Sequence, residues 1–126
     1  MQIFKSFNGK KVLITGHTGF KGSWLSIWLN QLGAKVHGVS LNVPTNPSHF
    51  NAADISNKIE DHRLDICDAE SIALLVQKIQ PDFVFHLAAQ ALVRPSYESP
   101  LETIQTNVIG TANILDALRG LKKAVV

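Results

Sequence analysis

A glycine-rich segment after a short apolar run constrains the fold of this chain more than any other feature. The run Val12-Leu13-Ile14 leads into Thr15-Gly16-His17-Thr18-Gly19-Phe20-Lys21-Gly22, and a helical pattern follows at 23–32. Glycines spaced Gly-x-x-Gly-x-x-Gly between a strand and a helix allow a sharp turn, a close approach of backbone N–H groups to a pyrophosphate, and tight helix–strand packing. The positive end of the helix dipole favours the same anion.

We therefore interpret this segment as a dinucleotide-binding turn. The alternative is a strand–helix turn that contains glycines and binds no ligand. The expected cofactor contacts are Gly16, Thr18, Gly19, Phe20, Lys21 and Gly22.

The composition is that of one globular domain. The chain has 126 residues, of which 45% are apolar and 17% charged, so we expect a single dinucleotide-binding domain over residues 1–126. The net charge of +2 gives no argument for a nucleic-acid partner. Residues 1–53 hold five lysines and no acid, whereas all ten acids lie from Asp54 onward. This basic first half suits an anionic ligand, and a chance distribution of surface lysines explains it equally well.

The cysteine content and the apolar runs indicate a cytoplasmic protein. Cys67, the single cysteine, has no partner for an internal disulfide and is expected to be a semi-buried thiol. The first residues carry no signal-peptide pattern, and no apolar run is long enough to span a bilayer. We therefore expect no membrane partner.

Strands alternate with helices along the chain. Apolar runs predict strands at 11–15, 35–41, 62–66 and 82–88, and periodic patterns predict helices at 23–32, 69–79 (capped by Asp68) and 100–119. This alternation predicts an α/β fold: a Rossmann-type doubly wound parallel sheet of order 3-2-1-4-5, with helices on both faces. The fifth strand, at 123–126, is cut short, so we expect a part of a longer protein.

Two helices carry apolar residues that we expect to face the sheet. Trp24 and Trp28 are spaced i, i+4 among leucines, which favours core packing over a stacking site. In the last helix the residues expected to face inward are Ile104, Val108, Ile109, Ile114, Leu115 and Leu118.

The ends of the second and third strands carry candidate adenosine contacts. A dinucleotide fold usually places an acid about 20 residues past the glycines to hold the ribose 2′-OH. Here Ser40 or Asn42 could accept that hydrogen bond, and no arginine is present to bind a 2′-phosphate, so NAD is favoured over NADP. Asp65, with Ile66 beside it, could reach the adenine amine; the alternative is a solvated aspartate.

The fourth strand ends in His86-Leu87-Ala88-Ala89-Gln90. Leu87, Ala88 and Ala89 leave room for the nicotinamide half of the cofactor, and His86 is expected to be a hydrogen-bonded core histidine rather than a general base. Asn107 is an amide in an apolar helix, where it either fixes a neighbouring loop or touches the cofactor. The histidines show no metal-ligand spacing, so we assign no metal site.

These motifs together resemble the extended short-chain dehydrogenase/reductase superfamily. The resemblance rests on Thr-Gly-x-x-Gly-Phe-x-Gly, Leu-Asp-Ile, His-Leu-Ala-Ala-Gln and Thr-Asn-Val-x-Gly-Thr. Within the superfamily the chain is most similar to the CDP-glucose 4,6-dehydratases, with which it shares the missing acid after the second strand. That similarity lies in the segment 16–25, in Pro44-Thr45-x-Pro47-Ser48 and in Gln90-Ala91-Leu92-Val93-Arg94-x-Ser96-Tyr97.

The resemblance implies a function for the whole enzyme. Such enzymes use bound NAD to oxidise the C4 hydroxyl of CDP-glucose, eliminate water across C5–C6 and return the hydride to C6. The product, CDP-4-keto-6-deoxyglucose, is a precursor of deoxysugars in bacterial surface polysaccharides. The resemblance also implies a homodimer or higher oligomer and substrate contacts at Gln90, Val93 and Arg94. Alternatives are another nucleotide-sugar 4,6-dehydratase or epimerase, and a non-catalytic dinucleotide-binding module.

No catalytic residue is assigned within residues 1–126. The Tyr-x-x-x-Lys pair of the superfamily follows the fifth strand, and the only tyrosine here, Tyr97, is followed four positions later by Leu101. We therefore expect Tyr97 to be a loop residue at the mouth of the site. By itself the chain is expected to bind NAD and to catalyse nothing.

Overall fold

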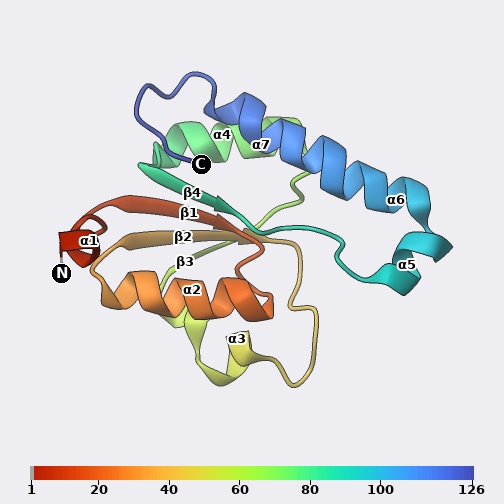
Figure 1. Ribbon diagram of the computed structural model, residues 1–126, viewed down its shortest axis with the longest axis horizontal. Helices are drawn as coiled ribbons and strands as arrows, with labels where there is room; N and C mark the ends of the chain where they lie inside the picture. The colour runs from red at the N-terminus through yellow and green to blue at the C-terminus, as the bar shows by residue number, and fades with distance from the viewer. Residues whose placement is uncertain (1) are drawn as a thin grey trace.

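A parallel sheet between two layers of helices forms the molecule, as the computed structural model of residues 2–126 shows (Figure 1). The strands β1 (Lys11–Thr15), β2 (Lys35–Ser40), β3 (Glu60–Arg63) and β4 (Phe83–His86) have the order β3-β2-β1-β4. At the free edge of β4, Val125 forms a parallel bridge with Phe83. The predicted α/β class and the order of the first four strands are therefore confirmed, and the single bridge at Val125 lies where the fifth strand was expected.

The helices lie on both faces of the sheet. One face carries α2 (Phe20–Gln31) and α3 (His49–Ala52), and the opposite face carries α4 (Ala69–Ile79) and α7 (Gly110–Leu118) (Figure 1). The remaining elements are α1 (Gln2–Lys5), the 3₁₀ turn η1 (Ile55–Asn57), α5 (Val93–Glu98), α6 (Pro100–Ile104) and the π-helical turn η2 (Gln105–Ile109). Within residues 2–126, no helix is long and apolar enough to cross a membrane.

Strand β1 is buried on both faces, as expected for the centre of a parallel sheet. Alternate side chains enter two separate cores. Leu13 joins the core under α4 and α7, whose other buried members are Val39, Ile66, Ile72, Leu75, Val76, Ile79, Val84, Ile114 and Leu118. Val12 and Ile14 join the core under α2, together with Leu29, Ala34 and Val36.

The third strand differs from the prediction. We expected 62–66, but β3 is Glu60–Arg63, a run of four polar residues. Its register with β2 runs from the pair His37 and Glu60 to the pair Ser40 and Arg63. An edge strand of this kind carries no apolar pattern, and the apolar residues that suggested a strand, Leu64 and Ile66, lie after its end.

The tryptophans of α2 are also placed differently from the prediction. Gly22, Ser23, Ser26 and Leu29 are the buried residues of this helix, whereas Trp24 and Trp28 are 53% and 54% exposed. Each tryptophan is two residues from Gly22 or Ser26, which turns it by about 200° to the opposite side of the helix. Small residues face the sheet because a Cβ on Gly22 would lie 2.7 Å from the Cα of His17. The helix lies too close for an indole ring to fit beneath it.

The last helix has apolar residues on two sides. The predicted helix at 100–119 is present but divided into α6, η2 and α7. Ile114 and Leu118 are buried as expected. Four residues expected to face inward are instead exposed by 41–56%: Ile104, Val108, Ile109 and Leu115. One side of the helix therefore covers α4 and the sheet, and an apolar side faces solvent.

Substitutions in α4 test the assigned core. Ile72 is 1% exposed and Leu74, on the same helix, is 61% exposed. Ile72→Ala removes buried methyl groups and leaves a cavity, so we expect it to lower the free energy of unfolding by about 2–5 kcal/mol. Gln77→Ala, at another exposed position of α4, should stay within about 0.5 kcal/mol of wild type in urea unfolding. Equal losses for the two variants would contradict the orientation of α4.

Candidate functional site

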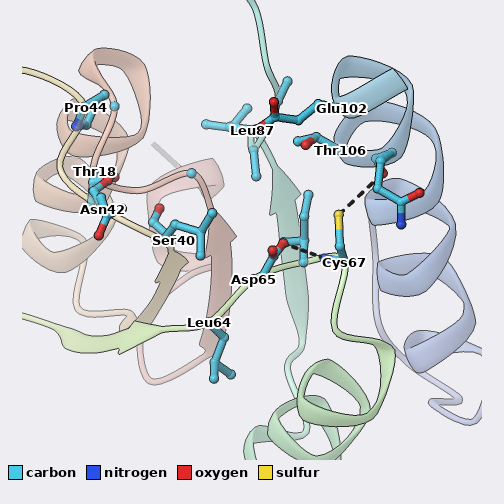
Figure 2. Close-up of a pocket in the computed structure, with 17 residues that line it drawn as sticks. Thr18, Ser40, Asn42, Pro44, Leu64, Asp65, Cys67, Leu87, Glu102 and Thr106 are labelled. Atoms are coloured by element: carbon cyan, nitrogen blue, oxygen red, sulfur yellow. Dashed lines mark hydrogen bonds between the residues drawn. The ribbon is translucent and has the colours of Figure 1, made fainter. Parts of the chain in front are cut away.

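A cavity of about 380 Å³ opens at the carboxyl ends of the strands. Small-molecule sites typically measure about 300–1,000 Å³ and, in open α/β sheets, lie at this end of the strands. Figure 2 shows Thr18, Ser40 and Asn42 on one side of the opening, Glu102, Thr106 and Cys67 on the other, and Asp65 between them. The predicted cofactor contacts that line the cavity are Gly16, Thr18, Gly19, Ser40, Asn42, Asp65, Ile66, Leu87, Ala88 and Ala89.

The three glycines of the turn have different roles. Gly16 has a φ of +78°, and a Cβ there would lie 2.7 Å from the backbone nitrogen of Ala88. Gly22 is required because a Cβ would overlap the carbonyl oxygen of Gly16. Gly19 differs: it is extended, with φ −74° and ψ 171°, and the nearest atom to a Cβ would be 3.4 Å away. The fold therefore requires Gly16 and Gly22, whereas Gly19 leaves space in the cavity for a ligand.

The helix α2 begins beside the cavity, which its N-cap residue lines. Gly19 is the N-cap, and no side chain caps this helix. The first N–H groups of a helix have no partner within the helix, so they are available to an anion. The side chains of Phe20 and Lys21 are exposed and do not line the cavity, and the Phe20 ring lies against His49 with centroids 6.0 Å apart. Gly22 lies beneath the turn, in contact with Gly16 and His17.

The end of β2 supplies two uncharged polar groups. Thr18 donates its hydroxyl hydrogen to the backbone carbonyl of Asn42 at 2.8 Å, which ties the glycine turn to the chain after β2. Ser40 Oγ is buried and has no hydrogen-bond partner within residues 2–126. A buried hydroxyl without a partner is unfavourable by about 1–3 kcal/mol. Ser40 lines the cavity, so a turn of its side chain toward the opening would give the hydroxyl a ribose partner, and the residues present fit a dinucleotide.

The end of β3 supplies a carboxylate and a thiol. Asp65 Oδ1 accepts a hydrogen bond from the backbone N–H of Cys67 at 2.8 Å. The Cys67 thiol donates to the carbonyl of Gln105 at 3.5 Å, and burial, followed by the charge of Asp65, raises its pKa. Ile66 is buried against Gly110, where a Cβ would come within 2.6 Å of its side chain. Asp65 and Cys67 therefore connect the sheet edge to the last helix across the cavity (Figure 2).

His86, at the end of β4, is a hydrogen-bonded histidine, as expected. His86 is half-buried, and its ring nitrogens hydrogen-bond to the hydroxyls of Thr15 and Thr111. Burial lowers the pKa of His86. The amide of Asn107 holds a loop, one of the two roles considered: its Oδ1 accepts from the Gln90 N–H at 2.8 Å and its Nδ2 donates to the Gln90 carbonyl at 3.0 Å. Asn107 does not line the cavity.

The three expected substrate contacts also lie outside the cavity. The Gln90 side chain bonds to the backbone of Leu92 and to the Thr103 hydroxyl. Val93 and Arg94 project from the exposed helix α5, where Arg94 pairs with Glu98 at 3.1 Å. Tyr97 is on α5 rather than in a loop, and it is 83% exposed.

Several lining residues were not predicted. They are Leu41, Pro44, Leu64, Cys67, Glu102, Gln105 and Thr106. The first four flank the predicted contacts at the ends of β2 and β3, so proximity in the sequence was a usable signal. Glu102, Gln105 and Thr106 are spaced i, i+3, i+4, which places polar side chains on one side of a helix. That polar face at the switch point was the overlooked signal.

His17 is a buried polar residue within the glycine turn. It is fully buried, and its Nε2 lies 2.7 Å from Asp61 Oδ1 on β3. Burial lowers the pKa of His17, and the hydrogen bond with Asp61 opposes this only in part. Burial tends to raise the pKa of Asp61, but hydrogen bonds from Arg63 and His17 outweigh this and lower it. A neutral imidazole paired with a carboxylate thus anchors the turn to the edge strand.

Comparison with known proteins places the chain among nucleotide-sugar enzymes. It matches the family described as GDP-mannose 4,6 dehydratase over residues 13–125. It is 50% identical to CDP-glucose 4,6-dehydratase of Salmonella typhimurium, over 98% of this chain and 35% of that protein. Two solved structures are similar. The epimerase Mth375 of Methanothermobacter thermautotrophicus has a TM-score of 0.80 and 29% identity, over 97% of this chain and 35% of that one. UDP-glucose 4-epimerase of Thermus thermophilus, in complex with NAD, has a TM-score of 0.77 and 30% identity, over 90% of this chain and 35% of that one.

The histidines make stability depend on pH. Burial is the first cause that lowers the pKa of each of four histidines: His17, His37, His62 and His86. Below about pH 6.5 the unfolded chain binds protons that the folded chain excludes, so the free energy of unfolding falls as the pH falls. We expect a lower urea midpoint at about pH 5.5 than at about pH 7.5.

A variant isolates one contribution to this pH dependence. The charged or titratable groups around His37 are His62, Glu60, Lys11 and Lys78. Burial lowers the pKa of His37 most, and the positive charge that His62 can carry lowers it further. His37→Gln removes one such group, so the fall in the midpoint on acidification should be smaller than in wild type. A wild-type midpoint that is unchanged or higher at the lower pH would contradict the assignment of buried, neutral histidines.

Proposed function

The chain belongs to the family described as GDP-mannose 4,6 dehydratase, and on this premise we propose that it forms the NAD-binding part of a dehydratase that acts on CDP-glucose. The chain spans about a third of the length of the curated relatives it matches. The observation that carries the proposal is the space beside Gly19, at the uncapped start of α2 and open to the cavity. The 50% identity to a CDP-glucose 4,6-dehydratase supports the reaction and the substrate.

The residues around the cavity suggest how the cofactor is held. The N–H groups of the first turn of α2 would bind the pyrophosphate, and Gly19 would leave the space that it needs. Ser40 and Asn42 would contact the adenosine ribose, and Asp65 would contact the adenine amine. The segment 87–89 would lie against the nicotinamide half. When bound, NAD supplies reversible hydride transfer, while this chain contributes binding and orientation.

Neighbouring activities are the second candidate. The two similar solved structures are epimerases, one of them in complex with NAD, which supports a shared cofactor domain across dehydratases and epimerases. Identity to the CDP-glucose enzyme, at 50%, is higher than identity to either epimerase. The absence of an acid at the end of β2, where Ser40 and Asn42 stand, also favours the CDP-glucose enzymes on the resemblance described above.

We further propose that the full protein self-associates through the exposed side of the last helix. Exposed apolar side chains on α6, η2 and α7 follow one another at spacings of three, four and seven residues, which are helical spacings. The helix α4 packs against α7 and carries another exposed leucine. These side chains are Leu74, Leu101, Ile104, Val108 and Leu115. Exposed apolar side chains repeated along one helix are typical of an interface, and an isologous pair would bury them on both copies.

Titration with NAD+ tests the cofactor proposal. Gly19→Val places a branched side chain in the space that a pyrophosphate would need, at a backbone conformation that valine adopts readily. We expect calorimetry to show NAD+ binding that is weakened about 100-fold or more, which corresponds to about 2.7 kcal/mol. NADP+ should bind more weakly than NAD+ to wild type.

A matched variant controls for the substitution itself. A Cβ added at Gly120 would have no atom within 4 Å, and Gly120 is not among the residues that line the cavity. Gly120→Val should bind NAD+ as wild type does, and Gly19→Val should still unfold cooperatively in urea, with a midpoint lowered only by the loss of a glycine at the N-cap. Unchanged NAD+ binding by a folded Gly19→Val variant would overturn the proposed cradle.

Charged substitutions test the proposed interface. Val108 is 56% exposed on η2, and Trp28 is 54% exposed on α2, across the sheet. Val108→Glu would bury a charge in the interface and should shift the protein toward monomer by at least about tenfold in the dissociation constant. Trp28→Glu should leave the dissociation constant of self-association unchanged, as measured by sedimentation velocity over a concentration series. Equal self-association of both variants and wild type would exclude this surface.

A further inference from the structure

A chain of hydrogen bonds crosses the molecule from β1 through β4 to α7. The Thr15 hydroxyl lies 2.6 Å from Nδ1 of His86, and the Thr111 hydroxyl lies 2.8 Å from Nε2 of the same ring. Thr15 Oγ1 also accepts hydrogen bonds from the backbone N–H groups of Leu87 and Ala88, both at 3.1 Å. Thr111 Oγ1 lies 2.6 Å from the carbonyl of Asn107.

The partners determine which ring nitrogen of His86 carries the proton. A hydroxyl oxygen has two lone pairs and one hydrogen. Thr15 Oγ1 accepts from the Ala88 N–H and shares the Leu87 N–H with the Thr15 carbonyl, which lies 3.0 Å from the same nitrogen. Its own hydrogen is left to donate to Nδ1 of His86, which is then an acceptor. Thr111 must donate to the carbonyl of Asn107, so its oxygen accepts from His86, and Nε2 carries the hydrogen. The Thr111 end of the chain requires the hydrogen on Nε2, and the contacts at the Thr15 end agree with it.

The surroundings of the ring favour this neutral form. The groups that face it from β1 and α7 are the two threonine hydroxyls, neither of which titrates in the physiological range. Burial lowers the pKa of His86. A proton on Nδ1 would compete for Thr15 Oγ1 with the Ala88 N–H and with the Leu87 N–H that this oxygen shares.

The chain continues to the segment that leaves β4. Asn107 belongs to the π-helical turn η2, and the Thr111 hydroxyl bonds to its carbonyl from four residues later. The side-chain amide of Asn107 accepts from the N–H and donates to the carbonyl of Gln90. Backbone groups of the segment 87–90 are thus held at both ends, at Leu87 and Ala88 by Thr15 and at Gln90 by Asn107.

We propose that His86, held as its Nε2–H form between Thr15 and Thr111, is a positioning residue that fixes the segment 87–90 at the edge of the cavity. It does not touch the cavity itself, and it acts through Thr15 and, by way of Thr111, through Asn107. A π-helical turn at this place agrees with such a role, because single π turns are frequent at functional sites. The link to cofactor orientation rests on the proposed function; the hydrogen-bond order does not.

The form of the ring can be measured without a ligand. We propose nitrogen NMR of the protein labelled with ¹⁵N-histidine near neutral pH, with His86 assigned by the signal lost in His86→Gln. The expected spectrum shows a protonated Nε2 and an unprotonated Nδ1. A ring protonated on Nδ1, a charged ring, or a mixture of the two neutral forms would overturn the proposal.

A pair of threonine variants tests the positioning role. Thr111→Val keeps the shape of the side chain but removes the acceptor for Nε2–H, whereas Thr111→Ser keeps the hydroxyl. By hydrogen exchange, the amides of Ala88 and Gln90 should exchange about tenfold faster in Thr111→Val than in wild type, and Thr111→Ser should restore the wild-type rate. The amides of Ile114 and Leu118, buried on α7, should be unaffected. Unchanged exchange at Ala88 and Gln90, or equal acceleration throughout α7, would overturn the proposal.

Addition of NAD+ separates this inference from the proposed function. If NAD+ binds, Thr111→Val should weaken its binding about tenfold and Thr111→Ser should not. If wild type fails to bind NAD+, the proposed cofactor is wrong, and the ring protonation and the exchange rates still decide whether His86 positions the segment 87–90.

Discussion

Contact between backbones at the end of β1 is the constraint on which the rest of the structure depends. The helix α2 and the segment after β4 both touch the turn at Gly16: a Cβ on Gly16 would lie 2.7 Å from the nitrogen of Ala88, and one on Gly22 would overlap the carbonyl of Gly16. Because main chain meets main chain here, one wall of the cavity consists largely of peptide groups and small side chains. The start of α2 then lies beside the cavity, which its N-cap Gly19 lines, and the unpaired N–H groups of a helix start are what an anion requires.

The same close packing reaches the edge of the sheet through His17. Its ring lies over Gly38 on β2, where a Cβ would overlap the ring, and its Nε2 bonds to Asp61 on β3 at 2.7 Å. Strand β3 has no apolar residue, so polar contacts hold it in addition to its backbone ladder. The His37 and His62 rings meet at 3.3 Å between nitrogens, and Arg63 lies over the Phe50 ring at 5.2 Å. A polar edge strand can therefore be ordered by the turn at the centre of the sheet.

The sequence was sufficient to predict the parts of the fold that depend on regular patterns. Apolar runs located β1, β2 and β4, and the topological rule placed ten predicted contacts around one cavity. It was insufficient where burial depends on neighbours: Trp24 and Trp28 fit an apolar stripe, yet the small residues of α2 face the sheet. The π-helical turn has no sequence signature that we could use, and it decides that Asn107 reaches Gln90. The form of His86 required the positions of two threonines from distant elements.

The lysines of the first half illustrate how misleading charge along a chain can be. They suited an anionic ligand, but most of them lie at the amino ends of the strands, opposite the cavity. Lys11 and Lys35 are paired at the start of β1 and β2, Lys11 Nζ donates to the carbonyl of Ile79 at 2.9 Å, and Lys10 lies 3.9 Å from Asp82. Only Lys21 belongs to the glycine turn, and its side chain does not line the cavity. Attraction for a pyrophosphate in this fold must therefore come from backbone N–H groups and the dipole of α2, which act over the short range of a hydrogen bond and select geometry rather than charge alone.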